Sequence, residues 1–266
     1  MSVLASFSLK GKVALVTGGA RTLGYDMAEA LAEAGAELVI TSRERERAQE
    51  SAARLHRDFG VAVLPLALDV RRYEEVAARI NEAHGWKGRI DVLVNNAGGG
   101  VGTGSPDLFE RSPDDIQALI DTNLVGMLYC CKEVGRIMAA QRSGKIINIA
   151  SIAALVGRDR KMYERNAMRA QPIDYAAAKA GVVGLTLDLA AYLAPYGVYV
   201  NCISPGGFER GQPAGFIRDY SERTALGRMG RDGVDIKAAA LFLASAASDY
   251  VTGHNLVLDG GFTLWH

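Results

Sequence analysis

The sequence has 266 residues, of which 49% are hydrophobic, enough for the core of an undivided α/β domain. Lysine plus arginine equals aspartate plus glutamate at 30 each, so the charge balance does not favour nucleic acid or an anionic membrane surface as a partner. The three cysteines lack metal or redox spacing, and neither a signal peptide nor an apolar run of transmembrane length is evident. We therefore expect a cytoplasmic protein without a bound metal that acts on a small molecule.

Predicted strands and helices alternate along the whole chain. Strands are expected at residues 12–17, 37–41, 61–67, 90–94, 145–150, 198–203 and 255–258. Helices are expected at residues 27–34, 43–59, 72–84, 113–141, 175–194 and 232–246. This alternation predicts right-handed crossovers and one Rossmann-type, doubly wound parallel sheet of about seven strands, with helices on both faces.

Glycine or polar residues follow most of the predicted strands at the point where each strand ends. They are Gly18, Ser42, Arg43, Asp69, Asn96 and Ser151, and Pro205 follows the sixth strand. The carboxyl ends of parallel strands meet at one edge of the sheet, and ligands of such sheets bind there. The sequence therefore predicts that these residues share one site.

Tyr175 and Lys179 are four positions apart and so lie on one face of a predicted helix. An ammonium beside a phenol favours the phenolate and is expected to lower the tyrosine pKa from about 10. Ser151 ends the strand before this helix, and its hydroxyl is able to orient a substrate oxygen. The three residues together indicate proton transfer to or from an alcohol or a carbonyl.

The chain resembles the short-chain dehydrogenase/reductase family over essentially its whole length. The motifs that carry this resemblance are Thr17-Gly-Gly-Ala-Arg-Thr-Leu-Gly24, Asp69-Val70, Asn95-Asn-Ala-Gly98, Asn123-Leu-Val-Gly126, Ser151, Tyr175-Ala-Ala-Ala-Lys179 and Pro205-Gly206. Within the family, the segments 194–197, 226–230 and 259–261 resemble those of gluconate 5-dehydrogenase-like reductases. The resemblance implies one dinucleotide-binding and catalytic domain over residues 1–266 and assembly as a homotetramer.

The resemblance also implies four catalytic residues. Tyr175 is the expected general acid and base, and Lys179 is expected to lower its pKa and to bind the nicotinamide ribose. Ser151 is expected to hold the substrate carbonyl or hydroxyl, and Asn123 to bind a water in a proton relay. Hydride would move between a carbinol carbon and the nicotinamide while Tyr175 moves the proton.

The glycine turn after the first strand is predicted to bind the cofactor pyrophosphate at a helix N-terminus. The family has a third glycine where this chain has Thr22, whose Cβ would hinder the pyrophosphate or whose hydroxyl would bind it. By resemblance, Asp69 and Val70 contact adenine, and Asn96 either lines a ribose or braces the sheet. The predicted cofactor-binding residues are Gly18, Arg21, Thr22, Leu23, Ser42, Arg43, Asp69, Val70, Asn96, Ala97, Gly98, Tyr175, Lys179, Pro205 and Gly206.

The end of the second predicted strand indicates which cofactor is preferred. NAD-selective sites place an acidic residue there to hold the ribose 2′-hydroxyl, whereas this chain has Ser42 and Arg43. Ser42 is able to hydrogen-bond a 2′-phosphate, and Arg43 to pair with it or to stack on adenine, unless it is a solvated charge at a helix start. We therefore predict NADP(H) as the preferred cofactor and NAD(H) as the alternative.

Ser151 and Tyr175 are 24 positions apart, about double the usual family interval. The excess lies at about residues 157–172, and we expect it to overhang the substrate pocket. Its basic residues, Arg158 and Arg165 among them, are predicted to bind a carboxylate or phosphate; the alternative is a solvated excursion or a subunit contact. Residues 207–228 are predicted to form a lid.

The predicted function is NADP(H)-dependent interconversion of a secondary alcohol and a ketone, on a sugar, a polyol, or a sugar or keto acid. One alternative is a 3-oxoacyl- or steroid-type carbonyl reductase with the same fold. The other is a non-catalytic regulator that binds a dinucleotide, against which the four catalytic residues argue.

Overall fold

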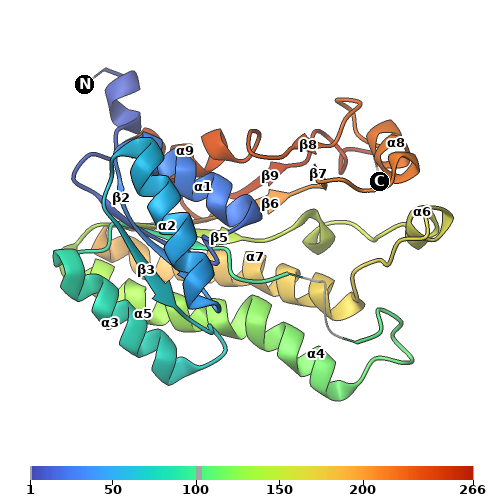
Figure 1. Cartoon of the computed structure of the whole chain (residues 1–266), viewed down its shortest axis with the longest axis horizontal. Helices are drawn as coiled ribbons and strands as arrows, with labels where there is room; N and C mark the ends of the chain where they lie inside the picture. The colour runs from blue at the N-terminus through green and yellow to red at the C-terminus, as the bar shows by residue number, and fades with distance from the viewer. Residues whose placement is uncertain (1, 100–103, 266) are drawn as a thin grey trace.

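Seven parallel strands form a single sheet, which helices cover on both faces (Figure 1). The computed structural model describes residues 2–99 and 104–265, so Met1 and His266, the ends of the predicted domain, lie outside the described residues. The strands are β1 (Val13–Thr17), β2 (Glu37–Ser42), β3 (Val63–Ala67), β4 (Val92–Asn95), β5 (Gly144–Ile149), β6 (Val198–Pro205) and β9 (Asn255–Leu258). Their order is β3-β2-β1-β4-β5-β6-β9, which confirms the predicted doubly wound sheet.

Each face of the sheet has its own hydrophobic core. The helices are α1 (Thr22–Glu33), α2 (Arg45–Phe59), α3 (Tyr73–Lys87), α4 (Pro113–Ile120), α5 (Gly126–Gln141), α6 (Arg160–Arg165), α7 (Ile173–Leu193), α8 (Ala214–Glu222) and α9 (Lys237–Ala244). Leu15 packs with α3, α5 and α7 on one face, while its neighbours Ala14 and Val16 pack with α1, α2 and α9 on the other. Successive strand residues point to opposite faces, which explains why the strand sequences are continuously apolar.

The order of the strands in the sheet determines where a ligand-binding crevice forms. The chain runs outward from β1 to β3 and then crosses back to β4, so the direction of the sheet reverses between β1 and β4. At such a reversal the loops beyond the two strands lead away from each other and leave a crevice at the carboxyl ends. The glycine turn after β1 and the Asn96 loop after β4 border this crevice.

The helix predicted over residues 113–141 is interrupted. A π-helical turn, Asp121–Val125, separates α4 from α5 and contains Asn123. The helix predicted over residues 232–246 is shorter than expected, because α9 spans only Lys237–Ala244 and a short strand, β8 (Gly230–Arg231), precedes it. Strand β8 pairs with β7 (Phe208–Glu209) in a separate two-stranded ribbon.

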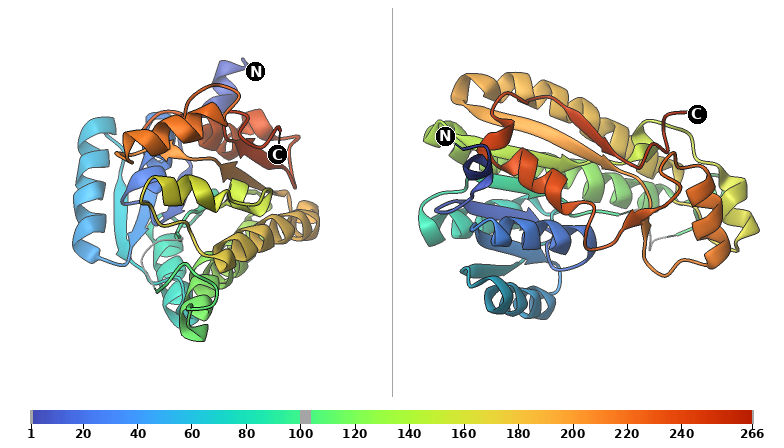
Figure 2. Two further views of the ribbon diagram at one scale, coloured as in Figure 1. Left: turned by 90° about the vertical axis from the view of Figure 1, so that its right-hand side faces the viewer. Right: turned by 90° about the horizontal axis from the view of Figure 1, so that it is seen from above.

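Two short helices, α6 and α8, lie in the predicted insertion and the predicted lid. Figures 1 and 2 show them beside each other beyond the carboxyl end of the sheet. They share a third hydrophobic cluster, made of Met162, Phe216, Tyr220, Met229 and Phe262. Two ion pairs join them as well, Arg165 with Asp219 at 3.2 Å and Arg223 with Asp159. The two predicted segments therefore form one packed unit.

One helix, Ile173–Tyr196, has the length and hydropathy of a membrane span, which corrects the expectation that no apolar run reaches that length. It consists of α7 and the short helical turn that follows. In this fold α7 packs against β5 and β6, and Val182, Ala190 and Leu193 belong to the core. The position of α7 against the sheet therefore accounts for the apolar residues on its inner face.

Candidate active site

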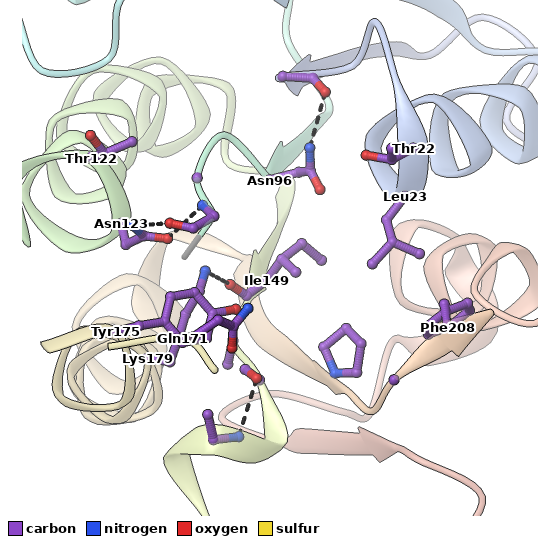
Figure 3. Close-up of a pocket in the computed structure, with 18 of the residues that line it drawn as sticks. Thr22, Leu23, Asn96, Thr122, Asn123, Ile149, Gln171, Tyr175, Lys179 and Phe208 are labelled. Carbon is purple, nitrogen blue, oxygen red and sulfur yellow. Dashed lines mark hydrogen bonds between the residues drawn. The ribbon is translucent and has the colours of Figure 1, made fainter. Parts of the chain in front are cut away.

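A cavity of about 910 Å³ lies at the carboxyl ends of the strands and extends beneath α6 and α8. Figure 3 shows part of its lining. With one exception, every residue that the sequence analysis assigned to the site lines this cavity. The exception is Arg165, whose guanidinium pairs with Asp219 on α8 and whose side chain is 54% exposed. The structure therefore does not bring Arg165 together with the other predicted site residues.

The turn after β1 is packed too tightly to accept side chains at its glycines. Gly18 has φ +61°, and a Cβ added to Gly24 would lie 2.3 Å from the carbonyl oxygen of Gly18. The Asn96 side-chain amide donates to the carbonyls of Thr17 and Gly18 at 3.1 and 3.0 Å. Of the two alternatives for Asn96, the structure places its side chain as a brace that holds the turn against the loop after β4.

Thr22 has a backbone conformation that favours glycine. Its φ is +47°, in the left-handed region that costs an L-residue about 1–2 kcal/mol and that β-branched residues rarely occupy. Its side chain is exposed and lines the cavity, close to Leu23 (Figure 3). The turn therefore keeps the shape of a phosphate-binding loop and adds a hydroxyl to its surface.

The cavity is rich in arginine at the end formed by β2 and β3. Arg21 and Arg43 are exposed there, and neither pairs with a carboxylate in the described part of the chain. Arg47 also lines this end, and Glu44 neutralises it at 2.8 Å. Asp69 binds Arg71, which holds the pKa of the Asp69 carboxyl below its usual value. The sequence analysis missed Arg47, although it lies four residues after Arg43, one turn along α2.

Lys179 and Ser151 connect the end of β5 to α7. The Lys179 ammonium is buried and donates to the carbonyl of Ile149 at 2.7 Å (Figure 3). Ser151 starts the short helical turn Ile152–Ala154, and its hydroxyl accepts a hydrogen bond from the backbone N–H of Ala153 at 3.1 Å. Tyr175 lies in the first turn of α7 with 8% of its surface exposed. The three predicted side chains are therefore brought together at the end of β5.

Asn123 stabilises the backbone on both sides of the site. Its side-chain amide donates to the carbonyls of Leu119 and Gly99 at 3.0 Å each, and its oxygen accepts from the Gly99 N–H at 2.9 Å. The π-helical turn opens the helix at this point, and the side chain compensates by bonding the Leu119 carbonyl. Asn123 is fully buried and fixes the loop after β4.

The pKa of the Tyr175 phenol is raised, which corrects the predicted lowering. Burial is the main cause, and it outweighs the hydrogen bonds of Ser151 and Gln171 and the charge of Arg158, which lower the pKa. Burial also lowers the pKa of Lys179 to about 8, so this ammonium is itself destabilised. The cation that offsets the effect of burial on the Tyr175 pKa is therefore Arg158, from the predicted insertion.

Arg158 is held in the cavity without a carboxylate partner among the described residues. Its two terminal nitrogens donate to the backbone carbonyl and side-chain oxygen of Gln171 at 3.2 and 2.5 Å. Its guanidinium also lies 5.7 Å from the ring centroid of Tyr163. Gln171 is not among the residues predicted from the sequence, because it precedes Pro172 and so lies outside the helix that carries Tyr175 and Lys179.

Two further arginines of the lining differ from Arg158. Arg169 is exposed at the cavity. Arg210 donates from its Nε to Asp232 at 2.6 Å. Arg158 is therefore the half-buried cation beside Tyr175, whereas Arg210 is neutralised.

Comparisons with known proteins agree with this site. A family model described as enoyl-(acyl carrier protein) reductase matches residues 18–263. A 2-dehydro-3-deoxy-D-gluconate 5-dehydrogenase of Formosa agariphila is 35% identical over 262 residues, which are 96% of this chain and 94% of the relative. A 3-oxoacyl-(acyl-carrier-protein) reductase of Chlamydia pneumoniae is 36% identical over 260 residues, 96% of this chain and 98% of the relative.

A solved structure is similar over the full length of both chains. It is a gluconate 5-dehydrogenase from Burkholderia cenocepacia in complex with NADP and tartrate, with 39% identity and a TM-score of 0.88, and the match covers 100% of each chain. The fold, the site and these relatives define an oxidoreductase that uses a nicotinamide dinucleotide. The chain belongs to the short-chain dehydrogenase/reductase family.

We predict that Gly98→Ala destabilises the protein by about 1–3 kcal/mol more than Gly99→Ala does. Both glycines have positive φ, at +156° and +148°, so the two variants share the backbone penalty. A Cβ at position 98 would lie 2.5 Å from Asn123 Oδ1, whereas a Cβ at position 99 meets no described atom within 4 Å. Urea unfolding of the two variants measures the difference, and equal losses would show that the Asn123 contact is unimportant.

Proposed function

We propose that the protein interconverts a secondary alcohol and a ketone with NADP(H), and that its substrate is a sugar acid or a keto acid. The observation that carries this proposal is Arg158, a cation without a carboxylate partner among the described residues, whose charge acts on the Tyr175 phenol. The relatives and the solved structure that act on gluconate derivatives support the same substrate class. We further propose a single domain over residues 1–266, with the insertion at 157–172 and the lid at 207–228.

The residues that line the cavity fit an NADP cofactor. A Cβ at Gly18 or Gly24 would press against the loop after β4 or the turn itself, so the two glycines keep the turn compact, which suits the close approach of a pyrophosphate to its backbone. Arg21, Arg43 and Ser42 are in place to bind a 2′-phosphate, since no carboxylate of the described residues neutralises either arginine. When bound, the cofactor supplies or accepts the hydride at its nicotinamide ring.

Further along the cavity, other lining residues would hold the rest of the cofactor. Asp69 and Val70 would contact the adenine, and the loop 96–98 would border the adenosine ribose. Pro205 and Gly206, at the end of β6, would border the nicotinamide. Lys179 would hydrogen-bond the nicotinamide ribose.

Proton transfer in this proposal belongs to Tyr175. Its phenol gives a proton to the developing alkoxide during reduction and takes it back during oxidation. Ser151 holds the substrate oxygen beside the phenol. The buried ammonium of Lys179 stabilises negative charge on this side of the cavity, and Asn123 is proposed to bind a water that connects Lys179 to solvent.

One observation favours a second function, reduction of 3-oxoacyl chains. The cavity has an apolar wall of Met162, Phe216, Met229 and Phe262, which suits an acyl chain. Relatives named 3-oxoacyl-(acyl-carrier-protein) reductases support it. An acyl substrate leaves Arg158 without a role in binding, so the response to Arg158 substitution separates the two functions.

We also propose that the protein assembles as a homotetramer in the cytoplasm. Family membership is the reason, and exposed apolar side chains on the outer faces of α5 and α7 support it. Leu128 and Leu187 are 46% and 57% exposed in the isolated chain. Sedimentation equilibrium of the purified protein would test the assembly.

The activity is tested by following NADPH at 340 nm with a panel of sugars, polyols, sugar acids, keto acids and 3-oxoacyl thioesters, in both directions. We predict turnover that Tyr175→Phe reduces by about 10²-fold or more, because the acid and base is lost. NADPH binding, measured by fluorescence, stays close to that of the wild type in the same variant. Tight NADPH binding by the wild type without turnover on any substrate would indicate the non-catalytic regulator instead.

We predict that Arg43→Leu raises KM for NADPH about tenfold or more and leaves KM for NADH nearly unchanged. The two cofactors differ only in the 2′-phosphate, and a charge-assisted hydrogen bond contributes about 1.5–3 kcal/mol. The steady-state constants of both cofactors at fixed ionic strength measure the effect. A wild type that prefers NADH would overturn this interpretation of Ser42 and Arg43.

We predict that Arg158→Gln raises KM for a sugar-acid or keto-acid substrate about tenfold or more, and changes KM for the matching neutral polyol far less. The lost contact is a guanidinium–carboxylate pair, which only the anion makes. Lys161→Gln is the matched control, because it removes the same charge from an exposed position on α6 outside the cavity lining. Unchanged KM for every anion tested would exclude the carboxylate site.

A further inference from the structure

The side chain of Gln171 bonds the Arg158 guanidinium and lies beside Tyr175. Its Oε1 accepts a hydrogen bond from Arg158 Nη2 at 2.5 Å, and its amide is close enough to the Tyr175 phenol to lower the pKa of that group. Figure 3 shows Gln171 beside Tyr175 and Lys179. Gln171 is half-buried and lines the cavity, two residues before the start of α7.

The chemistry of arginine decides which way this amide points. A guanidinium carries five N–H donors and no acceptor, so the atom that faces Arg158 has to be the amide oxygen. Arg158 Nη1 also donates to the backbone carbonyl of Gln171, and this second bond fixes the orientation of the guanidinium. The Gln171 NH₂ group is therefore the part of the amide that is free to face Tyr175, and it can only donate.

We propose that Gln171 is a positioning residue for proton transfer: Arg158 fixes its amide, and the amide then donates to the phenol oxygen of Tyr175. With that lone pair occupied by a donor, the phenol directs its own proton toward Ser151 and the substrate oxygen. The same donated hydrogen bond stabilises the phenolate that remains after the proton leaves. The proposal rests on the proposed role of Tyr175 as acid and base.

The proposed hydrogen bond from Gln171 matters because the Tyr175 phenol is shielded from water. Tyr175 is almost fully buried, so water provides little solvation for a phenolate. The charged and titratable groups that face it are Arg158 from the insertion, Tyr163 from α6 and Lys179 from α7. The Lys179 ammonium donates to the Ile149 carbonyl at 2.7 Å, and the polar side chains that lower the pKa of the phenol are those of Ser151 and Gln171.

Two substitutions of Gln171 separate this role from a purely structural one. Gln171→Met removes both the donor and the acceptor. Gln171→Glu keeps an oxygen for Arg158 but cannot donate to the phenol. We expect the pKa seen in the pH profile of kcat/KM for alcohol oxidation to rise by about one unit in Gln171→Met and by at least as much in Gln171→Glu.

If Gln171 only held the insertion in place, the effects of the two substitutions would rank in the opposite order. Gln171→Glu would then resemble the wild type, because an ion pair with Arg158 holds the segment at least as well, and Gln171→Met alone would lose activity. That order, or pKa values equal to the wild type in both variants, would overturn the proposal. Gln117→Met is the control, since Gln117 bonds Asp121 on the surface of α4 outside the cavity lining and is expected to leave the profile unchanged.

A measurement without turnover distinguishes this proposal from the proposed function. Protein labelled with ¹³C at the tyrosine ζ carbon reports each phenol by NMR, and the Tyr175→Phe variant identifies the resonance of interest. In the NADP⁺ complex, the Tyr175 resonance should titrate at higher pH in both Gln171 variants than in the wild type. This shift in a protein that turns over no substrate would refute the proposed function and show only that Gln171 hydrogen-bonds the phenol. Turnover without the shift would support the proposed function and overturn the role of Gln171.

Discussion

The site depends on the hydrogen bond between the buried Lys179 ammonium and the carbonyl of Ile149. Removing an ammonium from water is costly unless a partner replaces the water, and this carbonyl is the partner that the structure provides. The bond ties the second turn of α7 to the end of β5 and thereby fixes how far Tyr175 stands from Ser151. The buried ion pair of Arg111 with Asp174, at 2.8 Å, secures the first turn of the same helix. Together the two contacts make α7 a rigid support for the phenol.

A second constraint is the closeness of the loops after β1 and β4. Asn96 bonds the glycine turn and Asn123 bonds Gly99, so one half-buried and one buried amide hold both walls of the crevice. Neither amide leaves space for a Cβ at the glycine that it faces, Gly24 or Gly98. The glycine turn and the residues proposed for proton transfer are therefore parts of one hydrogen-bonded frame, which opens where the sheet reverses direction.

The insertion at residues 157–172 adds two polar side chains to this frame. Residues 157–172 do not form a detached excursion, because Met162 packs with Phe216 and Tyr220, and Arg165 pairs with Asp219. This packing delivers Arg158 and Gln171 to the phenol. The charge of Arg158 offsets part of the cost that burial imposes on a Tyr175 phenolate. The proposed substrate contact of Arg158 and the acidity of Tyr175 thus depend on the same segment.

Local patterns in the sequence determined the order of strands and helices, the positions of the site residues at the strand ends and the family, because buried strands and glycine turns leave short-range signals. The interruption at Asn123 and the short helices α6 and α8 were not predicted. Each is stabilised by contacts with distant segments, such as Met162 with Phe216, rather than by its own propensity. Only the tertiary structure decided that Arg165 turns to Asp219 while Arg158 reaches the cavity, because both arginines lie in the same basic stretch and only packing shows which one finds a carboxylate. The direction of the Tyr175 pKa was decided in the same way, because burial is a property of the folded chain.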